Sequence, residues 1–405
     1  MKRLQILPLA IFSIFFILMN WYVLGGLQVV APQSYLPAVF WFVITLSIFS
    51  VFYAIIGMQT RGVDRFFKIA THAFLTLFVS EVLFLLVLLS QDAYRLAAGT
   101  FYLVSDNQFL VPARNWIWIG VSIALFFFSV LIFLYGILKG KYAYRVIKHT
   151  LLFKNLPVAF DGFTITQISD IHAGSFSNSK AVQNGIDIIN AQQSDLFVFT
   201  GDLVNNKAEE IKPWIGHFSQ IKAKYGQFSV LGNHDYGDYV KWENELAKQA
   251  NLQQLKKYHE ELGFRLLLDE HVELQKDGEK IVLAGIENWG LGFGERGDLA
   301  KALLGTTKDE FKILLSHDPS HWEVQVKNNL NHVHLTLAGH THGMQFGIEA
   351  FGVKWSPVKF RYKHWAGIKE ENNRILNVNR GFGFIGFSGR IGIWPEITVI
   401  KLNKS

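Results

Sequence analysis

Five short polar motifs in the second half of the chain carry residue types that bind metal ions or transfer protons. In chain order they are Asp170-Ile-His172, Gly201-Asp202, Gly232-Asn233-His234-Asp235, His317 and Gly339-His340-Thr341-His342-Gly343. The chain has no cysteine, so its metal ligands must be oxygen and imidazole nitrogen. Such donors favour Mn²⁺, Fe²⁺/Fe³⁺ or Zn²⁺ over copper(I) or an iron–sulfur cluster. The motifs therefore predict a metal-binding site.

Each motif follows a short apolar run that is typical of a buried strand. The runs are 163–169, 196–200, 227–231, 311–315 and 334–338, with amphipathic stretches at 180–190 and 211–221 between the first three. This alternation predicts an α/β layered sheet, whose ligands bind beyond the carboxyl ends of its strands. The expected remaining elements are a helix at 240–262 and strands at 265–268, 272–274, 281–284, 375–378 and 396–402. The five motifs should therefore meet at one edge of the sheet.

The ordered motif set over residues 160–402 resembles the calcineurin-like metallophosphoesterase family. The chain is most similar to its membrane-tethered bacterial members and to animal transmembrane proteins with a metallophosphoesterase domain. Its glycine-rich end, from Asn379-Arg380-Gly381-Phe382-Gly383 to Trp394-Pro395-Glu396-Ile397, is also similar to that subgroup. One departure is Asn205, where many relatives have aspartate. The family does not use that position as a direct metal ligand.

The resemblance implies a layered β-sandwich flanked by helices, with a site for two divalent metal ions. By that resemblance Asp170, His172 and His342 hold the first ion, Asn233, His317 and His340 hold the second, and Asp202 bridges them. His234 is the expected catalytic residue, which protonates the leaving-group oxygen. The implied activity is metal-dependent hydrolysis of a phosphodiester, phosphomonoester or pyrophosphate by a metal-bridging hydroxide. Asp235 either orients His234 or caps the helix that follows.

Four apolar stretches at the N-terminal end predict membrane-spanning helices. They cover residues 4–27, 36–58, 66–89 and 116–138, and each reaches the ~20 residues that cross a bilayer core. Together they predict a transmembrane domain at 1–140, followed by a basic linker at 141–159 and the metallophosphoesterase domain at 160–405. Glu81 is costly inside hydrocarbon, so we expect it to face a helix partner or water.

The distribution of charge predicts the orientation in the membrane. One set of flanks carries ten basic residues and the other carries only Arg95 and Arg114. The ten are Lys2, Arg3, Arg61, Arg65, Lys68, Lys139, Lys141, Arg145, Lys148 and Lys154. The positive-inside rule therefore places both termini and the catalytic domain on the cytoplasmic side of the cell (inner) membrane, in a multi-pass arrangement.

Charge also bears on the partners of the catalytic domain. Residues 1–155 hold 12 Lys/Arg and 4 Asp/Glu, whereas the rest of the chain holds 27 and 29, a net charge of −2. No nucleic-acid partner is therefore expected. Basic and aromatic residues interleave between residues 351 and 365, with a second apolar patch at 289–294. This pattern favours a domain that lies against the bilayer and takes a lipid-linked substrate, although an ordinary strand explains it equally well.

Two alternatives stay open at this stage. The enzyme could act on a soluble nucleotide or phosphoprotein, with the helices serving only as an anchor. The soluble domain could instead regulate a four-helix transporter or sensor. The identity of the substrate, the native metals and the oligomeric state do not follow from the sequence.

Overall fold

The computed structural model describes residues 6–32, 35–61, 64–350 and 352–405, and it divides into two compact units, Met1–Tyr135 and Gly136–Ser405. Lys2, Arg3 and the first two residues of the predicted span 4–27 lie outside the described residues.

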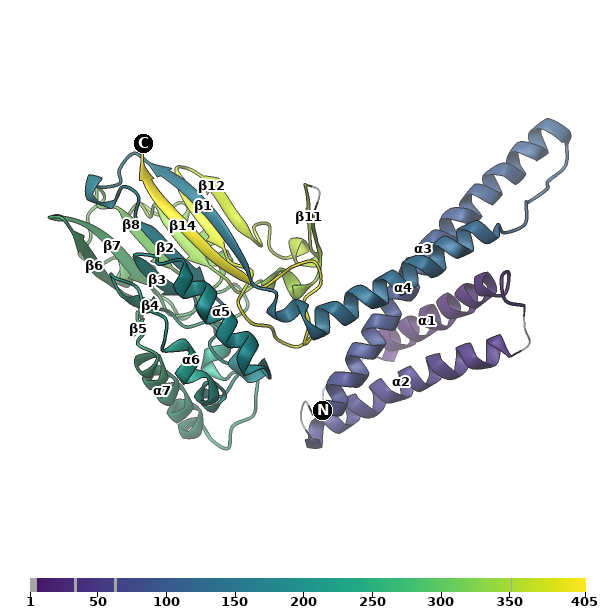
Figure 1. The fold of residues 1–405 in the computed structure, drawn as a ribbon, viewed down its shortest axis with the longest axis horizontal. Coiled ribbons are helices and arrows are strands. Elements are labelled where there is room, and N and C mark those ends of the chain that lie inside the picture. The colour runs from purple at the N-terminus through teal and green to yellow at the C-terminus, as the bar shows by residue number, and fades with distance from the viewer. Residues whose placement is uncertain (1–5, 33–34, 62–63, 351) are drawn as a thin grey trace. The chain divides into compact units, whose positions relative to one another are not determined.

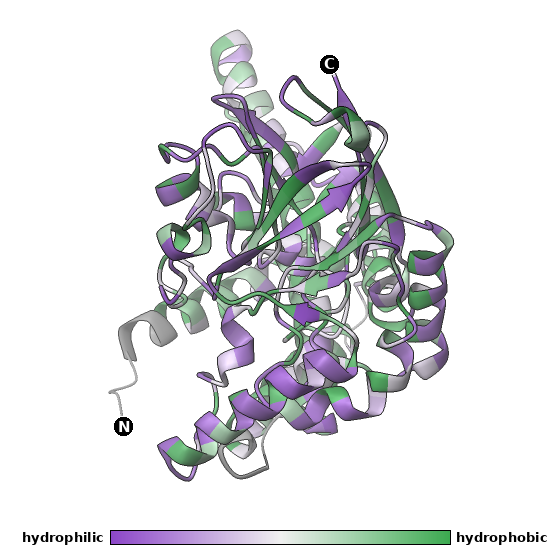
Figure 2. Cartoon of the chain, turned by 90° about the vertical axis from the view of Figure 1, so that its left-hand side faces the viewer, coloured by the Kyte–Doolittle hydropathy of each residue, from purple (hydrophilic) through white to green (hydrophobic). Residues whose placement is uncertain are grey.

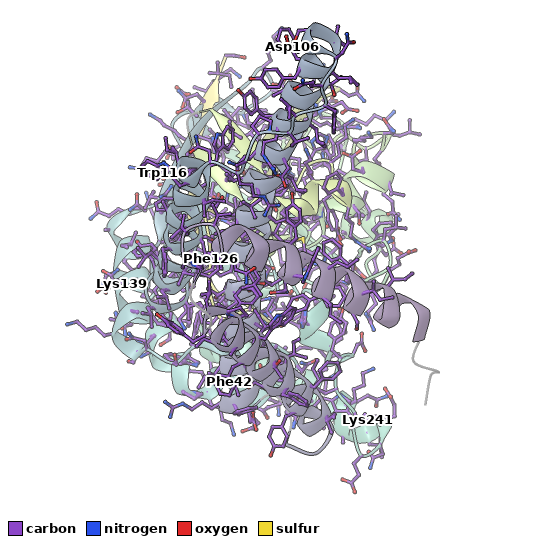
Figure 3. The ribbon with its side chains drawn as sticks, turned by 90° about the vertical axis from the view of Figure 1, so that its right-hand side faces the viewer. Phe42, Asp106, Trp116, Phe126, Lys139 and Lys241 are labelled. Carbon is purple, nitrogen blue, oxygen red and sulfur yellow. The ribbon has the colours of Figure 1, made fainter. Side chains whose placement is uncertain are left out.

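The N-terminal unit is built from long apolar helices (Figure 1). Within the described residues these are α1 (Ile6–Leu27), α2 (Leu36–Arg61), α3 (Arg65–Asp106) and α4 (Trp116–Leu138). Three of them are long and apolar enough to cross a membrane, and the described apolar part of α1, Ile11–Leu27, is shorter. Large apolar side chains such as Phe42, which is 67% exposed, point outward (Figure 3), as they do on helices that face lipid. The predicted transmembrane unit is thus confirmed.

The third helix differs from its predicted span, because it continues to Asp106 instead of ending at residue 89. The extension contains Asp92, whose carboxylate forms ion pairs of 2.6 Å with both Arg95 and Arg114. The two basic residues expected on the far side of the membrane are therefore held by one acidic partner.

Glu81 lies inside the N-terminal unit and is 4% exposed. It lines a cavity of about 370 Å³ whose other walls are apolar side chains of α1, α2, α3 and α4. Among the described residues, its Oε2 atom has no hydrogen-bond partner. The carboxyl group therefore faces the interior of the helical unit.

The second unit contains two sheets, each with six strands among the described residues (Figure 1). The first sheet has the order β1 (Arg145–Phe153), β14 (Glu396–Lys404), β2 (Thr164–Ile168), β3 (Leu196–Phe199), β4 (Gln227–Ser229) and β5 (Arg265–Leu266). The second has the order β12 (Gly367–Glu371), β13 (Arg374–Val378), β9 (Leu335–Ala338), β8 (Lys312–Leu315), β7 (Glu279–Gly285) and β6 (Glu270–Lys276). A short hairpin, β10 (Ile348–Ala350) and β11 (Val353–Trp355), stands apart from both sheets.

The two sheets pack face to face with helices on their outer sides. Apolar residues of both sheets, including Ile165, Val198, Leu283 and Ile313, form the core between them, which Figure 2 draws in green. The helices α5 (Ser179–Ala191), α6 (Ile215–Phe218) and α7 (Glu245–Glu261) pack on the first sheet. On the second sheet pack α8 (Leu299–Ala302) and the π-helical turn Trp322–Val326, which follows the short helix α9 (Pro319–His321). Each fully buried Leu, Ile or Phe stabilises such a core by about 1.5–3 kcal/mol. The predicted layered sandwich flanked by helices is confirmed.

Two segments differ from the sequence-based expectation. The region 141–159, expected to be a linker, contains β1, which pairs with β14 in parallel over nine residues. Its exposed, partly basic character is that of an edge strand with one face toward water. The predicted helix 211–221 is instead a 3₁₀ helix, Ala208–Trp214, followed by the single turn α6. Pro213 lacks an amide donor, so a regular α-helix cannot continue through it.

Candidate metal centre

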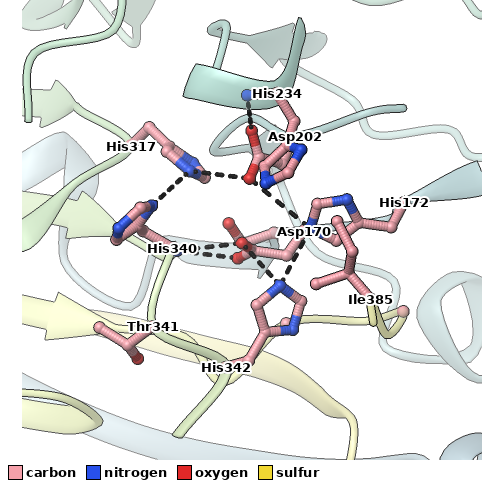
Figure 4. Close-up of polar contacts among 12 residues, drawn as sticks. Asp170, His172, Asp202, His234, His317, His340, Thr341, His342 and Ile385 are labelled. Atoms are coloured by element: carbon pink, nitrogen blue, oxygen red, sulfur yellow. Dashed lines mark hydrogen bonds and ion pairs between the residues drawn. The ribbon is translucent and has the colours of Figure 1, made fainter. Parts of the chain in front are cut away.

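The five polar motifs lie at the carboxyl ends of parallel strands in both sheets. Asp170 and His172 follow β2, Asp202 follows β3, Asn233 and His234 follow β4, His317 follows β8, and His340 and His342 follow β9. The strands β2, β3 and β4 are parallel to one another, as are β8 and β9. Parallel strands end at the same edge of a sheet, so all these side chains converge (Figure 4).

The backbone of the site adopts a conformation that L-amino acids rarely use. Five predicted ligands have positive φ angles: Asp170 (53°), His172 (47°), Asp202 (62°), His340 (70°) and His342 (49°). Left-handed backbone at non-glycine residues costs energy and gathers at functional sites, where the surrounding structure holds it. At Gly339 an added Cβ would lie 2.4 Å from Asp170 Oδ2, and at Gly232 it would lie 2.2 Å from Asp202 Oδ1. The two carboxylates therefore occupy space that only glycine leaves open.

The first group of converging donors consists of Asp170, His172 and His342, all of which are buried. One ligand atom from each lies within 4.8 Å of the others. The Nε2 atoms of His172 and His342 are 3.0 Å apart, and His342 Nε2 is 3.2 Å from Asp170 Oδ1. Three lone-pair donors at this spacing suit a single divalent cation.

The second group contains Asp202, His317 and His340, whose ligand atoms also lie within 4.8 Å of one another. His317 Nε2 is 3.3 Å from His340 Nδ1. Asn233 joins this group, because its Oδ1 lies 2.9 Å from the same nitrogen of His340. The Asn233 amide is oriented by its own Nδ2, which donates to the Tyr239 hydroxyl at 2.8 Å, so its oxygen faces the group.

Asp202 stands between the two groups. Its Oδ2 lies 3.6 Å from His172 Nε2 in the first group and 3.2 Å from His317 Nε2 in the second. Its Oδ1 accepts a hydrogen bond from the His234 amide at 2.9 Å, which fixes the plane of the carboxylate. One buried carboxylate oxygen is therefore shared by both groups of donors.

The electrostatics of the buried site fit a cation. Burial disfavours ionisation of Asp170, but attraction and hydrogen bonding from His342 keep the pKa of its carboxyl below the usual range. Burial also works against protonation of His317, yet the Asp202 carboxylate outweighs it and raises the pKa of the imidazole to about 10. The His317 ring donates from Nδ1 to the Thr200 carbonyl at 2.7 Å, so the proton beside Asp202 sits on Nε2. A divalent cation would take the place of that proton.

His234 lies at the rim of the site and is half-buried. Its Nδ1 donates to the Asn205 carbonyl at 2.7 Å, and its ring is packed against His172 and Tyr239. This hydrogen bond orients the ring and leaves Nε2 for a bound molecule. The substitution of asparagine for aspartate at 205 leaves the backbone carbonyl, which makes this contact, unchanged.

Asp235 does not contact the His234 ring. Its carboxylate accepts hydrogen bonds from the amides of Gly232, Asp202 and Leu203 at 2.8–2.9 Å. It therefore caps the short turn Asn233–Tyr236 and ties it to the loop after β3. Burial, together with the nearby Asp202 charge, raises the pKa of Asp235 to about 7.

Two residues that contact the ligands were missed in the sequence. Asp318 Oδ2 lies 3.3 Å from His340 Nε2, and the adjacent His317 was the only local signal for it. Arg390 is fully buried, and its guanidinium lies 3.1 Å from His342 Nδ1 while it donates to the carbonyls of Gly381 and Gly383. Arg390 is 48 residues from His342, so no motif connects the two.

Comparisons with known proteins identify metallophosphoesterase relatives of this chain. Residues 163–344 match the family model described as calcineurin-like phosphoesterase, and residues 3–141 match the one described as probable calcineurin-like phosphoesterase, transmembrane domain. The chain is 29% identical over 261 residues to the uncharacterized metallophosphoesterase YkuE of Bacillus subtilis, which covers 64% of this chain and 85% of that protein. It is 28% identical over 279 residues to a zebrafish (Danio rerio) transmembrane protein with metallophosphoesterase domain, covering 67% and 60%. An uncharacterized metallophosphoesterase of Helicobacter pylori is 25% identical over 344 residues, covering 82% and 83%.

The layered α/β fold is that of a metallophosphoesterase domain. The chain thus has a calcineurin-like phosphoesterase domain at residues 163–344, preceded at residues 3–141 by a transmembrane domain of the kind found with such phosphoesterases. It spans about 60% of the length of the zebrafish relative. The family uses divalent metal ions, and this chain holds the side chains that could bind them.

Proposed function

We propose that this protein is a membrane-anchored phosphoester hydrolase with two divalent metal ions. The observation that carries the proposal is the position of Asp202, whose Oδ2 lies within 3.6 Å of a histidine from each donor group. Asp170, His172 and His342 would hold the first ion, and Asn233, His317 and His340 the second. Mn²⁺, Fe²⁺/Fe³⁺ and Zn²⁺ all suit these donors. Such a pair of ions, when bound, polarises a phosphoryl group and activates water.

The proposed reaction is hydrolysis of a phosphodiester, a phosphomonoester or a pyrophosphate. Water adds to phosphorus, the bond from phosphorus to the leaving-group oxygen breaks, and a proton moves to that oxygen. His234 would supply this proton. The proposal is supported by its Nδ1, which is engaged by the Asn205 carbonyl, and by the position of the residue in the lining of the cavity at the donor groups. Imidazole suits this role, since its pKa lies near neutral pH.

The test is hydrolysis of a panel by the full-length protein loaded with Mn²⁺, from bis-p-nitrophenyl phosphate through nucleotides to lipid pyrophosphates. His234→Ala should keep both metal ions and lose rate by roughly 10²–10⁴-fold on a phenyl ester, and by less on a p-nitrophenyl ester, which needs little protonation. His271→Ala is the matched control, because His271 lies on β6, outside the donor groups, and its ring bonds to the Ala302 carbonyl of α8. An equal loss on both esters would contradict the acid role, and no hydrolysis by fully metal-loaded protein would contradict the function.

The alternatives carry different expectations. A phosphatase of a soluble nucleotide or phosphoprotein would use the helices as an anchor only and should turn over nucleotides at least as fast as lipid-linked esters. A regulatory domain of a transporter would depend on the membrane unit, where the buried Glu81 is the one specific observation in favour. Glu81→Gln, assayed separately for hydrolysis and for solute flux, distinguishes these cases. Loss of a flux with unchanged hydrolysis would favour the transporter.

A further inference from the structure

The proposed metal centre opens into a cavity of about 640 Å³ whose remaining walls are largely apolar. His172, Asp202, Asn233 and His234 line one part of this cavity. Beyond these and the other donor residues, the walls combine a few polar side chains with apolar ones from separate segments: Phe293, Met344, Val358, Phe360, Ile385 and Phe387. Figure 4 draws Ile385 beside the first donor group. If the phosphoryl group of a bound molecule reaches the donor groups, the rest of that molecule therefore contacts the apolar side chains of the cavity wall.

The uncharged polar side chains Thr341, Gln345 and Tyr362 in the same walls are already engaged within the protein. The Thr341 hydroxyl donates to the Trp365 carbonyl at 2.6 Å, and the Tyr362 hydroxyl donates to Asp318 at 3.0 Å. Both ends of the Gln345 amide are also paired, through Nε2 to the Phe387 carbonyl and through Oε1 from the Ile385 amide. A nucleobase or sugar in this cavity would lose its hydrogen bonds to water without replacement, which is unfavourable. A hydrocarbon chain needs no such partners.

Two large apolar side chains at this cavity are strongly exposed. Phe360 is 82% exposed and Met344 is 57% exposed. Single exposed apolar residues are common, but these two flank the entrance to the same metal centre. Met344 also has a positive φ of 50° and lies two residues after the proposed ligand His342. The loop that contains the proposed metal ligand His342 therefore also contains the solvent-exposed apolar side chain of Met344.

The structure changes which residues of the predicted membrane-facing segment could contact lipid. Phe351 lies outside the described residues. Trp365 and Tyr362 are buried with Val358 and Ile393, and Trp289 of the second predicted patch is buried beneath the second sheet. The segment is also not a strand at 359–365, since it forms a 3₁₀ turn, Pro357–Phe360, and then irregular backbone. Phe360 is the aromatic residue of that segment that is left most exposed beside the metal centre.

We infer that the substrate is a lipid phosphate ester, whose hydrocarbon chain lies along the Phe360, Met344, Ile385 and Phe387 wall while its phosphoryl group lies at the metal centre. The inference rests on the proposed function and adds the substrate class to it. Arg361 lines the same cavity and is exposed, and its guanidinium lies over the Phe293 ring and donates to the Leu291 carbonyl at 3.3 Å. Its positive charge at the cavity suits the anionic phosphate of such a molecule. Apolar helices on the same chain associate with a bilayer, so lipids are the amphiphiles present at high local concentration.

The test varies only the length of the apolar chain. Ethyl, butyl and octyl esters of p-nitrophenyl phosphate share one phosphodiester and one leaving group. Hydrolysis by the full-length, metal-loaded protein should have a kcat/KM for octyl that exceeds that for ethyl by about 10-fold or more, since each buried methylene favours binding. In Phe360→Gln and Met344→Gln this ratio should fall severalfold. Both side chains are exposed, so their replacement leaves the core intact.

A control and a vesicle experiment complete the test. Leu330→Gln replaces an apolar residue that is 87% exposed and is not part of this cavity, so it should keep the wild-type ratio. Reconstituted protein should release p-nitrophenolate from phosphatidyl-p-nitrophenol in phosphatidylcholine vesicles, more slowly in Phe360→Gln than in Leu330→Gln. Hydrolysis of the ethyl ester with no dependence on chain length would overturn this inference alone. No hydrolysis of any ester with both metal ions bound would overturn the proposed function itself.

Discussion

The His340 imidazole is oriented by a carboxylate, because its Nε2 lies 3.3 Å from Asp318 Oδ2. The carboxylate accepts, so the ring proton is on Nε2 and the lone pair is on Nδ1. That nitrogen is the one that lies 2.9 Å from Asn233 Oδ1 and 3.3 Å from His317 Nε2. The Tyr362 hydroxyl donates to the same oxygen of Asp318 at 3.0 Å and holds it in place. The contact therefore selects the His340 nitrogen that would bind the second metal ion.

The first prediction follows from this contact. Asp318→Asn replaces the acceptor with an amide that can turn its donor toward His340, and we expect the affinity for the second ion to fall by about 10–100-fold. Titration with Mn²⁺, followed by electron paramagnetic resonance, measures it. Tyr362→Phe is the matched control, since it removes one hydrogen bond but keeps the carboxylate, and it should have a smaller effect. Equal Mn²⁺ affinity in Asp318→Asn and the wild type would show that the carboxylate does not orient the ligand.

The second prediction concerns the shared carboxylate. Asp202→Ala should remove much of the bound metal and essentially all turnover, because both donor groups lose an oxygen at once. Elemental analysis of the purified protein measures the metal content. Asp187→Ala, on the exposed face of α5, serves as the control and should bind metal normally. Retention of two ions per chain in Asp202→Ala would refute the bridging assignment.

The third prediction uses three glycines of the last apolar helix and its end. A Cβ at Gly136 would lie 2.6 Å from the Arg390 carbonyl oxygen, and one at Gly140 would lie 2.6 Å from the Trp394 ring. Gly120 has no atom within 4 Å of the same position. Alanine at Gly136 or Gly140 should therefore destabilise the second unit by about 1–3 kcal/mol through overpacking. Alanine at Gly120 should be neutral or slightly stabilising.

Thermal unfolding and metal content of the three variants measure this effect. The Arg390 amide donates to the Gly136 carbonyl at 3.2 Å, and the Arg390 guanidinium contacts His342. A displaced Arg390 should therefore also lower metal occupancy in the Gly136 and Gly140 variants. If the Gly136 and Gly140 variants unfold at the same temperature as the Gly120 variant, the segment that contains Arg390 and Trp394 can move aside without loss of stability, and the prediction is wrong.

The fourth prediction concerns acid stability. His259 is fully buried and bonds to the Ser229 hydroxyl, and burial lowers the pKa of its imidazole to about 3. The unfolded chain takes up this proton near pH 6.5 and the folded chain does not, so stability falls as the pH drops from about 6.5 toward 3. For this one residue the loss between pH 7 and pH 5 is about 2 kcal/mol.

Urea unfolding of the full-length protein at pH 7 and pH 5, followed by tryptophan fluorescence, measures this loss. In His259→Gln the difference between the two pH values should shrink by that amount, whatever the absolute stability of the variant. His259→Phe provides a second, non-titrating variant if the buried amide prevents folding. An unchanged pH dependence in both would indicate that His259 is protonated in the folded protein.

The fifth prediction concerns orientation in the membrane. Ten basic residues flank the apolar helices on the side that includes the C-terminus, and only two flank them on the other side, which predicts a cytoplasmic C-terminus. A fluorescent protein fused after Ser405 should fluoresce and an alkaline phosphatase fused there should be inactive, with the opposite result for fusions in the loop 107–115 between α3 and α4. Active phosphatase at Ser405 would move the catalytic domain to the other side of the membrane.

The fold was largely predictable where hydrophobicity alone decides the structure. The apolar helices, the strand β3 and most of β8 and β9 read as apolar runs, because both faces of these strands are covered. The strand β2 is less uniform, since it also buries Thr166 and Gln167. The strand β1 was missed because polar residues interrupt its apolar pattern on both faces, with Arg145 and His149 on one face and Lys148 on the other. Only its pairing with β14, some 250 residues away, makes it a strand. Likewise β12 depends on its pairing with β13.

For the site, the sequence by itself determined the donor set, its order and its place at strand ends, because the parallel topology brings those ends to one edge. Tertiary structure alone decided which donors meet, since His172 and His342 are 170 residues apart and Asn233 and His340 are 107 apart. It also decided the roles of Asp318 and Arg390. Aspartate and arginine are common on protein surfaces, so only the contacts of these two residues with His340 and His342 distinguish them. The apolar wall of Met344, Phe360, Ile385 and Phe387 is of the same kind, because side chains from separate loops become one surface only when the chain has folded.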